Sequence, residues 1–314
     1  MKKPLIVVVG SSNTDMIIKV KRIPRAGETV LGGEFMSAAG GKGANQAVAA
    51  SRAGGQVSLI ARVGSDVLGD RAIAGFVKDG IDVSGVTRDR RLASGTAFIF
   101  VAGNGENSIA VASGANARLS PADVTKARAV ARAKVLLMQL ETPLDTVSKA
   151  ARLAVAHGAL VILNPAPARS LPNDLLRYVS ILTPNQSEAE LLTGIRLNSI
   201  ANAEKAAEKL RRRGVRTVVL TLGARGALIA DERGTRLVSG FKVKAVDTTA
   251  AGDTFNGALA VALAEGQPID QAVLVANAAA AISVTRWGAQ PSAPTRREIR
   301  RLLKTKQGAS QAAR

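Results

Sequence analysis

The segment VDTTAAGDTFNG, residues 246–257, joins a run of small residues to the start of a helix. Beyond it, apolar side chains recur at the i, i+3, i+4, i+7, i+8 spacing of one helix face, which predicts a helix from about Gly252 to Gly266. The first amides of a helix lack internal acceptors and lie at its positive end, where small side chains let an anion approach. We therefore expect an anion hole at Ala250, Ala251 and Gly252.

Asp253 would lie beside that anion hole. A carboxylate next to a bound phosphate group is repelled by it, which is unfavourable unless the carboxylate has a use. Accepting the proton of a hydroxyl group that attacks the phosphorus is such a use, so Asp253 is a candidate base for phosphoryl transfer. The alternative interpretation is that Asp253 only caps the N-terminus of the helix.

The rest of the chain alternates short apolar runs with helix-like segments. Six nearly continuous apolar runs, from PLIVVVG at 4–10 to TVVLTLG at 217–223, have the composition of strands that helices cover on both faces. This alternation predicts an α/β fold with a doubly wound, mostly parallel sheet. Ligands of such folds bind at the carboxyl ends of the strands.

Two segments interrupt the alternation. Residues 14–36 and 94–112 look like strands and hairpins without helices between them, so we expect a small β-sheet inserted twice into the main domain. The main domain would then comprise residues 1–13, 37–93 and 113–303. The tail from 304 to 314 is expected to be disordered.

Composition excludes several kinds of site. There are no cysteines, which rules out disulfides, zinc–thiolate sites and cysteine nucleophiles, and the one histidine, His157, is expected at an exposed helix end. The net charge of +19 is spread over scattered short groups and aromatic residues are only 3%, so we expect no dedicated nucleic-acid partner. No apolar run reaches membrane-spanning length, and we expect a cytoplasmic protein without a membrane partner.

The usual phosphate-binding motifs are absent. The segment GGKGAN at 40–45 contains Gly-Lys but lacks the spacing and the following Ser or Thr of a P-loop, and it is not GxGxxG. Longer blocks at 38–47, AAGGKGANQA, and at 247–253, DTTAAGD, instead resemble the two signature regions of the ribokinase-like carbohydrate kinases. Five more blocks resemble the same family, in the same order: SSNTD, LMQLETP, NPAPAR, TPNQSEAE and TLGARG. The resemblance spans essentially the whole chain.

The resemblance implies an enzyme that transfers phosphate from ATP to O5 of D-ribose, with Asp253 as the base and residues 250–253 as the anion hole. Kinases for deoxyribose or a nucleoside are alternatives within the family. A sugar- or nucleic-acid-binding regulator that has lost catalysis is an alternative from another class, although the intact AAGD argues against it. The resemblance also implies a homodimer formed through the inserted β-sheet, which would act as a lid.

The matching positions give a set of expected contacts. Those for the sugar are Asn13, Asp15, Gly41, Lys42, Gly43, Asn45, Glu141 and Asp253. Those for ATP are Asn185, Glu188, Thr221, Gly223, Gly226, Gly252 and Asn277. Mg²⁺ would bind near Asn185 and Glu188, since a carboxylate with bound waters is what this ion accepts.

A monovalent cation, K⁺, is implied beside the anion hole. The matching positions are Asp247, Thr249, Ser283, Arg286, Gly288 and Ser292. Taken singly, many of these residues also have purely structural interpretations: a turn after the first strand for Asn13 and Asp15, a helix cap for Asn185 and Glu188, and a backbone partner in the core for Asn277. The segment GAQPS at 288–292 could equally be a turn containing proline.

Overall fold

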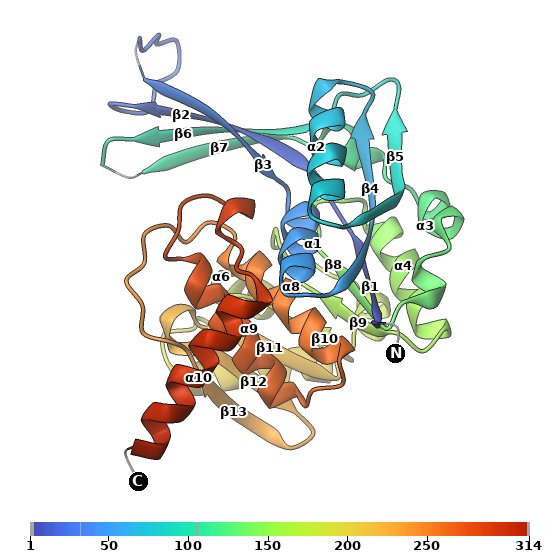
Figure 1. Ribbon diagram of the computed structural model, residues 1–314, viewed down its shortest axis with the longest axis vertical. Coiled ribbons are helices and arrows are strands. Elements are labelled where there is room, and N and C mark those ends of the chain that lie inside the picture. Colours follow the sequence, from blue (N-terminus) through green and yellow to red (C-terminus); the bar gives the residue numbers. More distant parts are fainter. Residues whose placement is uncertain (1–2, 32, 105, 313–314) are drawn as a thin grey trace.

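The computed structural model describes residues 3–31, 33–104 and 106–312, with side chains as far as Thr305. Its larger sheet has nine strands in the order β13-β12-β11-β10-β9-β8-β1-β4-β5 (Figure 1). The strands are β1 (Leu5–Val9), β4 (Gln56–Gly64), β5 (Asp82–Asp89), β8 (Val135–Met138), β9 (Leu160–Leu163), β10 (Ile181–Leu182), β11 (Thr217–Thr221), β12 (Gly226–Asp231) and β13 (Gly234–Ser239). All pairs from β5 to β11 are parallel, and β12 and β13 add an antiparallel hairpin at the edge.

The order of the strands reverses at β1. From there the chain proceeds to β4 and β5 on one side and, later, from β8 to β11 on the other. Ligands of doubly wound sheets bind where the order reverses, at the carboxyl ends of the strands. Ser11 and Ser12 follow β1 at this edge and Glu141 follows β8, so polar side chains from distant parts of the sequence meet there.

Helices cover both faces of the larger sheet. The helices are α1 (Lys42–Arg52), α2 (Val67–Lys78), α3 (Pro121–Ala127), α4 (Leu144–Ala156), α5 (Asn173–Leu176), α6 (Gln186–Thr193), α7 (Ile200–Arg212), α8 (Ala251–Ala264), α9 (Ile269–Ser283) and α10 (Arg296–Ala312). Side chains of β1 alternate between two cores: Ile6 and Val8 pack with α1, α8 and α9, and Val7 and Val9 pack with α3, α4, α6 and α7. The predicted doubly wound α/β fold is confirmed.

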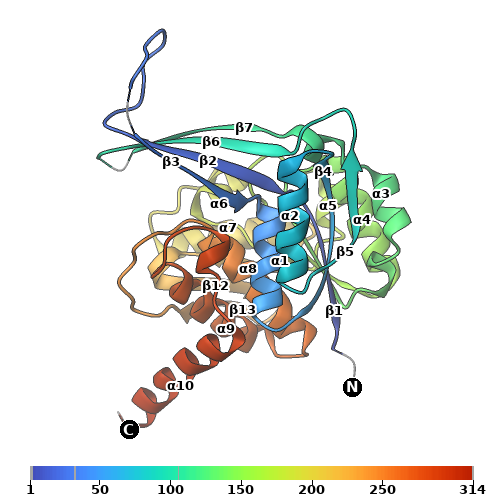
Figure 2. The ribbon, with the colours of Figure 1, turned by 45° about the horizontal axis from the view of Figure 1, so that its top comes forward.

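A second sheet projects beyond the first (Figures 1 and 2). Its four strands lie in the order β3-β2-β6-β7 and comprise β2 (Asn13–Val20), β3 (Glu34–Gly40), β6 (Gly95–Ala102) and β7 (Asn107–Ala112). They come from the two segments that interrupt the sequence pattern, as expected, although β2 already begins at Asn13 and β3 continues to Gly40. At the base of this sheet Asn13 pairs with both Gly40 and Gly95.

Two expectations concern the chain outside the sheets. Helix α10 continues to Ala312, so the prediction of a disordered tail from 304 is wrong for residues 304–312; Lys, Gln and Ala in this stretch favour helix. Residues 313 and 314 lie outside the described part. His157 ends α4 and is exposed, as predicted. None of the helices in the described ranges is both long and apolar enough to span a membrane.

Candidate active site

The start of α8 opens onto free space. Ala250, at the cap position, has the left-handed conformation φ 56°, which residues with a Cβ rarely adopt. The amide of Ala251 donates to Thr248 O at 3.2 Å, which corrects the expectation that this amide is open. The amides of Gly252 and Asp253 are second and third in the helix and have no acceptor within it. A Cβ added to Gly252 would meet no atom within 4 Å, so an anion can approach this turn.

Asp253 is buried, with 6% of its surface exposed. Its Oδ1 accepts from Gln46 Nε2 at 2.9 Å and its Oδ2 accepts from Asn45 Nδ2 at 3.1 Å. Both oxygens therefore face α1 and do not cap α8. Burial raises the pKa of Asp253, and the opposing effects of the Lys42 charge and the two amides do not cancel this rise. A raised pKa makes the carboxylate a stronger base.

A network of amide side chains surrounds this carboxylate. Gln46 is fully buried; its Nε2 also donates to Asn164 Oδ1 at 3.1 Å, and its Oε1 accepts from Gln139 Nε2 at 2.5 Å. On the far side, Asn256 Nδ2 donates to Gly252 O at 2.8 Å. The sequence argument did not assign roles to these four residues, although each lies within or next to a block that resembles the family. The network fixes the positions of Asp253 and Gly252 together.

Carboxylates and one lysine converge among the residues that the sequence assigns to the sugar. Glu141 Oε2 accepts from the Lys42 amide at 2.9 Å and from the Ser11 hydroxyl at 2.5 Å. Burial, and after it the charges of Glu141 and Asp253, raise the pKa of Asp15 to about 6. Burial alone would lower the pKa of the Lys42 ammonium group, but Asp253, Glu141 and Glu188 outweigh burial and raise it. The structure thus brings together the residues that the sequence assigns to the sugar.

Two features make this pocket suitable for hydroxyl groups. Among the described residues, the buried Oδ1 of Asn45 has no hydrogen-bond partner, which leaves it as an acceptor for a ligand. Gly41 has φ 87°, and a Cβ there would lie 2.6 Å from the amide nitrogen of Asn13. A Cβ on Gly43 would lie 2.5 Å from the Ser11 nitrogen. These two glycines therefore let the start of α1 lie directly against the residues that follow β1. Their role is a close backbone contact, and not only a turn before a helix.

A small cavity of about 160 Å³ adjoins Asp253. It is lined by Lys42, Asp253 and the start of α8, and also by Asn185 and Glu188. Asn185 and Glu188 form a reciprocal capping box at the start of α6, so the structural interpretation of this pair is confirmed. Burial raises the pKa of Glu188 despite the amide of Asn185 and the charge of Lys42. The same pair thus stabilises a helix end and faces the cavity.

A larger, mainly apolar cavity of about 440 Å³ continues from Gly252 towards β12 and α9. It is lined by Thr221, Gly223, Gly226 and Asn277, four of the residues that the sequence assigns to ATP. Asn277 Nδ2 donates to Val238 O at 3.0 Å, so this side chain does satisfy a backbone group, which was its alternative interpretation. This hydrogen bond is compatible with the assigned contact to ATP, because Asn277 also lines the cavity.

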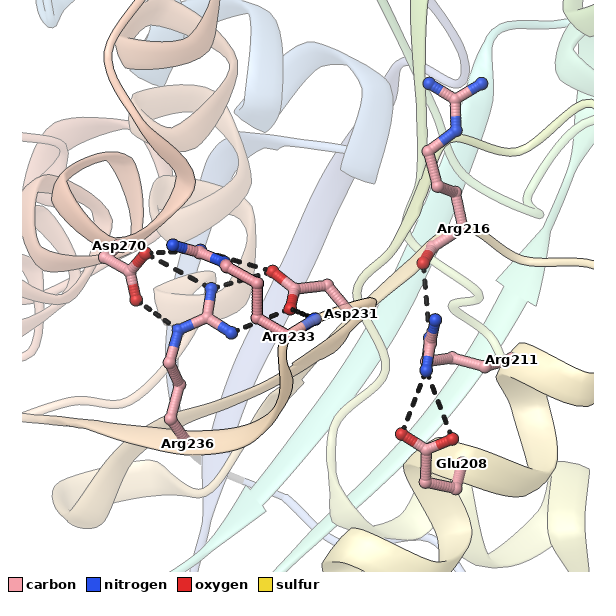
Figure 3. Close-up of polar contacts among 7 residues, drawn as sticks. All are labelled: Glu208, Arg211, Arg216, Asp231, Arg233, Arg236 and Asp270. Carbon is pink, nitrogen blue, oxygen red and sulfur yellow. Dashed lines mark hydrogen bonds and ion pairs between the residues drawn. The ribbon is translucent and has the colours of Figure 1, made fainter.

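The wall formed by β12, β13 and α9 is tied together by ion pairs (Figure 3). Arg236 contacts Asp231 on β12, with Nη2–Oδ2 at 2.7 Å, and also Asp270 in the first turn of α9. Arg233 joins the same two carboxylates and lies 2.7 Å from Asp270. This cluster fixes the edge hairpin against α9.

The positions assigned to a monovalent cation form two adjoining loops. Asp247 accepts from the amides of Thr249 and Gly288, both at 2.9 Å, and so connects the loop before α8 to the loop after α9. The side chains of Ser283 and Ser292 donate to nearby carbonyl groups, and Arg286 pairs with Glu298. Within the described ranges, no three His, Cys, Asp or Glu side chains are placed to hold a metal ion together.

Comparison with known proteins agrees with this geometry. Residues 3–296 match the pfkB family carbohydrate kinases. The ribokinase of Haemophilus influenzae is 47% identical over 304 residues, covering 96% of this chain and 99% of that protein. The deoxyribokinase of Salmonella typhi is 37% identical, covering 92% and 95%. The structure of Arabidopsis thaliana ribokinase complexed with ribose and ATP has a TM-score of 0.89 at 32% identity, covering 97% and 99%. The chain therefore belongs to the pfkB family of carbohydrate kinases.

Proposed function

We propose that the protein transfers the γ-phosphoryl group of ATP to O5 of D-ribose, giving ribose 5-phosphate and ADP. The position of Asp253 is the single observation that carries this proposal. Its buried carboxylate lies between a pocket with an unpaired amide acceptor and the open N-terminus of α8. The relatives named ribokinase, matched over nearly their full length, support ribose as the acceptor.

The chain's own groups supply the steps of the reaction. The pocket around Asn13, Asp15 and Asn45 would bind the hydroxyl groups of the sugar and point its 5-hydroxyl towards Asp253. As that oxygen bonds to phosphorus, its proton passes to Asp253 and the bond to the ADP oxygen breaks. The free amides at the start of α8 and the ammonium group of Lys42 stabilise the negative charge on the phosphoryl oxygens.

Two metal ions belong to this proposal. Bound Mg²⁺ would neutralise part of the charge on the phosphates; Glu188, a buried carboxylate that lines the cavity of about 160 Å³ together with Asp253, fits an ion that keeps most of its waters. K⁺ would bind where Asp247 joins its loop to the loop that contains Gly288. Carbonyl groups of Thr249, Ser283, Arg286 and Ser292 would complete this site.

We also propose that the second sheet is a lid and that two such sheets pair in a homodimer. Phe35, Phe98, Ile109 and Val111 on the second sheet are each more than half exposed, which supports a partner sheet in a homodimer. Five apolar residues of this sheet differ in burial: Val20 is buried, Ile17, Phe100 and Val101 are half-buried, and Phe98 is exposed. Use of ATP supports a cytoplasmic location.

Deoxyribose is the second candidate acceptor, because a deoxyribokinase also matches over nearly its full length. A nucleoside is less well supported, since Tyr178 packs beside Arg152 and the exposed Trp287 follows α9, both outside the sugar pocket. A regulator without catalysis would not need a buried carboxylate with a raised pKa. The acceptor and the activity can be tested together.

The test is ADP release from ATP and Mg²⁺ with ribose, 2-deoxyribose and nucleosides, each with and without K⁺. We expect strong turnover on ribose that rises with K⁺. Asp253→Asn should reduce turnover by about 10³-fold or more while ribose still binds in calorimetry. Turnover of the variant close to that of the wild type would remove Asp253 from the mechanism, and no turnover on any acceptor would favour the regulator.

A further inference from the structure

Asn116, a residue outside every assigned site, holds one of the expected sugar contacts. It lies in the short helical turn Gly114–Arg118 that follows β7, and only 2% of it is exposed. Its Oδ1 accepts from the Ser12 amide at 2.9 Å, and its Nδ2 donates to Ser12 O at 3.0 Å and to Asn13 Oδ1 at 2.7 Å. All the hydrogen bonds that this side chain requires are made to two residues at the base of the second sheet.

This arrangement has only one possible polarity. An amide side chain that faces both the N–H and the C=O of Ser12 must direct its oxygen to the N–H group and its NH₂ to the C=O group. The second N–H of Asn116 then points at Asn13, which must accept this hydrogen bond with its side-chain oxygen. Consequently the NH₂ group of Asn13 donates to no described residue and is available to a ligand.

The backbone at Gly95 packs tightly against the two amides. A Cβ added to Gly95 would lie 2.2 Å from Asn116 Nδ2 and 2.2 Å from Asn13 Oδ1. Gly95 is thus required so that the two amides can meet over the first residue of β6. Asn13 itself is 7% exposed, so its orientation is not averaged by solvent.

We infer that Asn116 is a positioning residue that makes Asn13 a hydrogen-bond donor to the sugar. This inference rests on the proposed function. Asn13 and Asp15 are two residues apart on β2, so their side chains lie on the same face of the strand. The NH₂ group of Asn13 is therefore a donor beside the carboxylate acceptor of Asp15. A pair of hydroxyl groups, one accepting from Asn13 and one donating to Asp15, fits this fixed polarity. Without Asn116, Asn13 could rotate and place a second acceptor beside Asp15.

The experiment is a double-mutant cycle on KM for ribose with Asn116→Ala and Asn13→Ala. We expect Asn116→Ala to raise KM about tenfold, more than it lowers kcat, because Asp253 and the anion hole are untouched. In the Asn13→Ala background the same substitution should change KM by less than twofold. An equal effect of Asn116→Ala in both backgrounds would overturn the inference, since Asn116 would then act through the backbone of Ser12.

Thr146→Val is the matched control. The Thr146 hydroxyl donates to Leu119 O at 2.7 Å and so holds the same segment of chain without touching Asn13. This variant should lower the melting temperature while leaving KM within twofold of the wild type. A comparable rise in KM would reduce Asn116 to a structural role. Calorimetric binding of ribose to each variant separates these outcomes from failure of the proposed function, in which the wild type itself would neither bind nor turn over ribose.

Discussion

The ionised carboxylate of Asp15 should lower the free energy of unfolding by a measurable amount. Burial and the charges of Glu141 and Asp253 raise its pKa from 3.8 to about 6. The folded state therefore binds this proton more tightly than the unfolded state, and the contribution of Asp15 to stability is greatest below pH 4. It falls as the pH rises and the loss is complete above about pH 6. A difference of about two pKa units corresponds to roughly 3 kcal/mol.

Substitution of Asp15 by Asn should recover this free energy. The amide has nearly the same shape, carries no charge and can donate to the neighbouring carboxylates. At pH 8 we expect the free energy of unfolding to rise by up to about 3 kcal/mol, and at pH 5 by only about half as much. Affinity for ribose should fall in the same variant, because an acceptor for a hydroxyl group is lost. Denaturant titrations at the two pH values and calorimetry with ribose measure these changes.

Glu34→Gln is the control for the Asp15 variant. Glu34 lies on the same sheet, is 77% exposed and, among the described residues, has an ion pair with Lys19 alone, so its substitution should change the stability by less than about 0.5 kcal/mol at either pH. An Asp15→Asn variant no more stable than the wild type at pH 8 would refute the reasoning. So would a gain of the same size at pH 5 and pH 8, since this would show that the change does not come from titration of Asp15.

The remaining predictions concern the base and the lid. Gln46→Leu removes a hydrogen bond to the charged form of Asp253, worth about 1.5–3 kcal/mol, and should move the acid limb of the pH profile of kcat upward by about one to two units. An unmoved limb would show that Gln46 does not act on Asp253. Ile109→Asp should convert a dimer to monomers in sedimentation, whereas Leu237→Asp on the edge hairpin should not. A wild-type protein that already sediments as a monomer would contradict the lid dimer.

Much of the site could be predicted because it is local in sequence. The turn at 250–253, the glycines before α1 and the alternation of strands and helices all depend on residues close together in the chain. The exception within this turn is the amide of Ala251, which donates to Thr248 O through a turn conformation that an Ala at position 250 does not reveal.

The amide contacts could not be predicted because they depend on the order of strands in the sheet. Gln46 and Gln139 are 93 residues apart and meet because β1 and β8 are neighbours. Asn116 and Ser12 are 104 residues apart and meet where the two inserted segments join the main domain. Buried glutamine and asparagine side chains have no periodic signal in a sequence, so only the assembled fold shows which of them are partners.

If the second sheet closes as the proposed lid, its attachment separates binding from enclosure in time. Asn13 lies at its base, and the eight residues of β2 reach about 26 Å from there at ~3.3 Å per residue. If the sheet swings about its base, the far ends of its strands travel several ångströms while Asn13 scarcely moves. Under this proposal a sugar would bind to the open protein, and its hydroxyl groups would contact Asn13 before the lid closes. A wrong sugar would then dissociate without any need for the lid to reopen. The lid would close only over sugars whose hydroxyl groups have already bound.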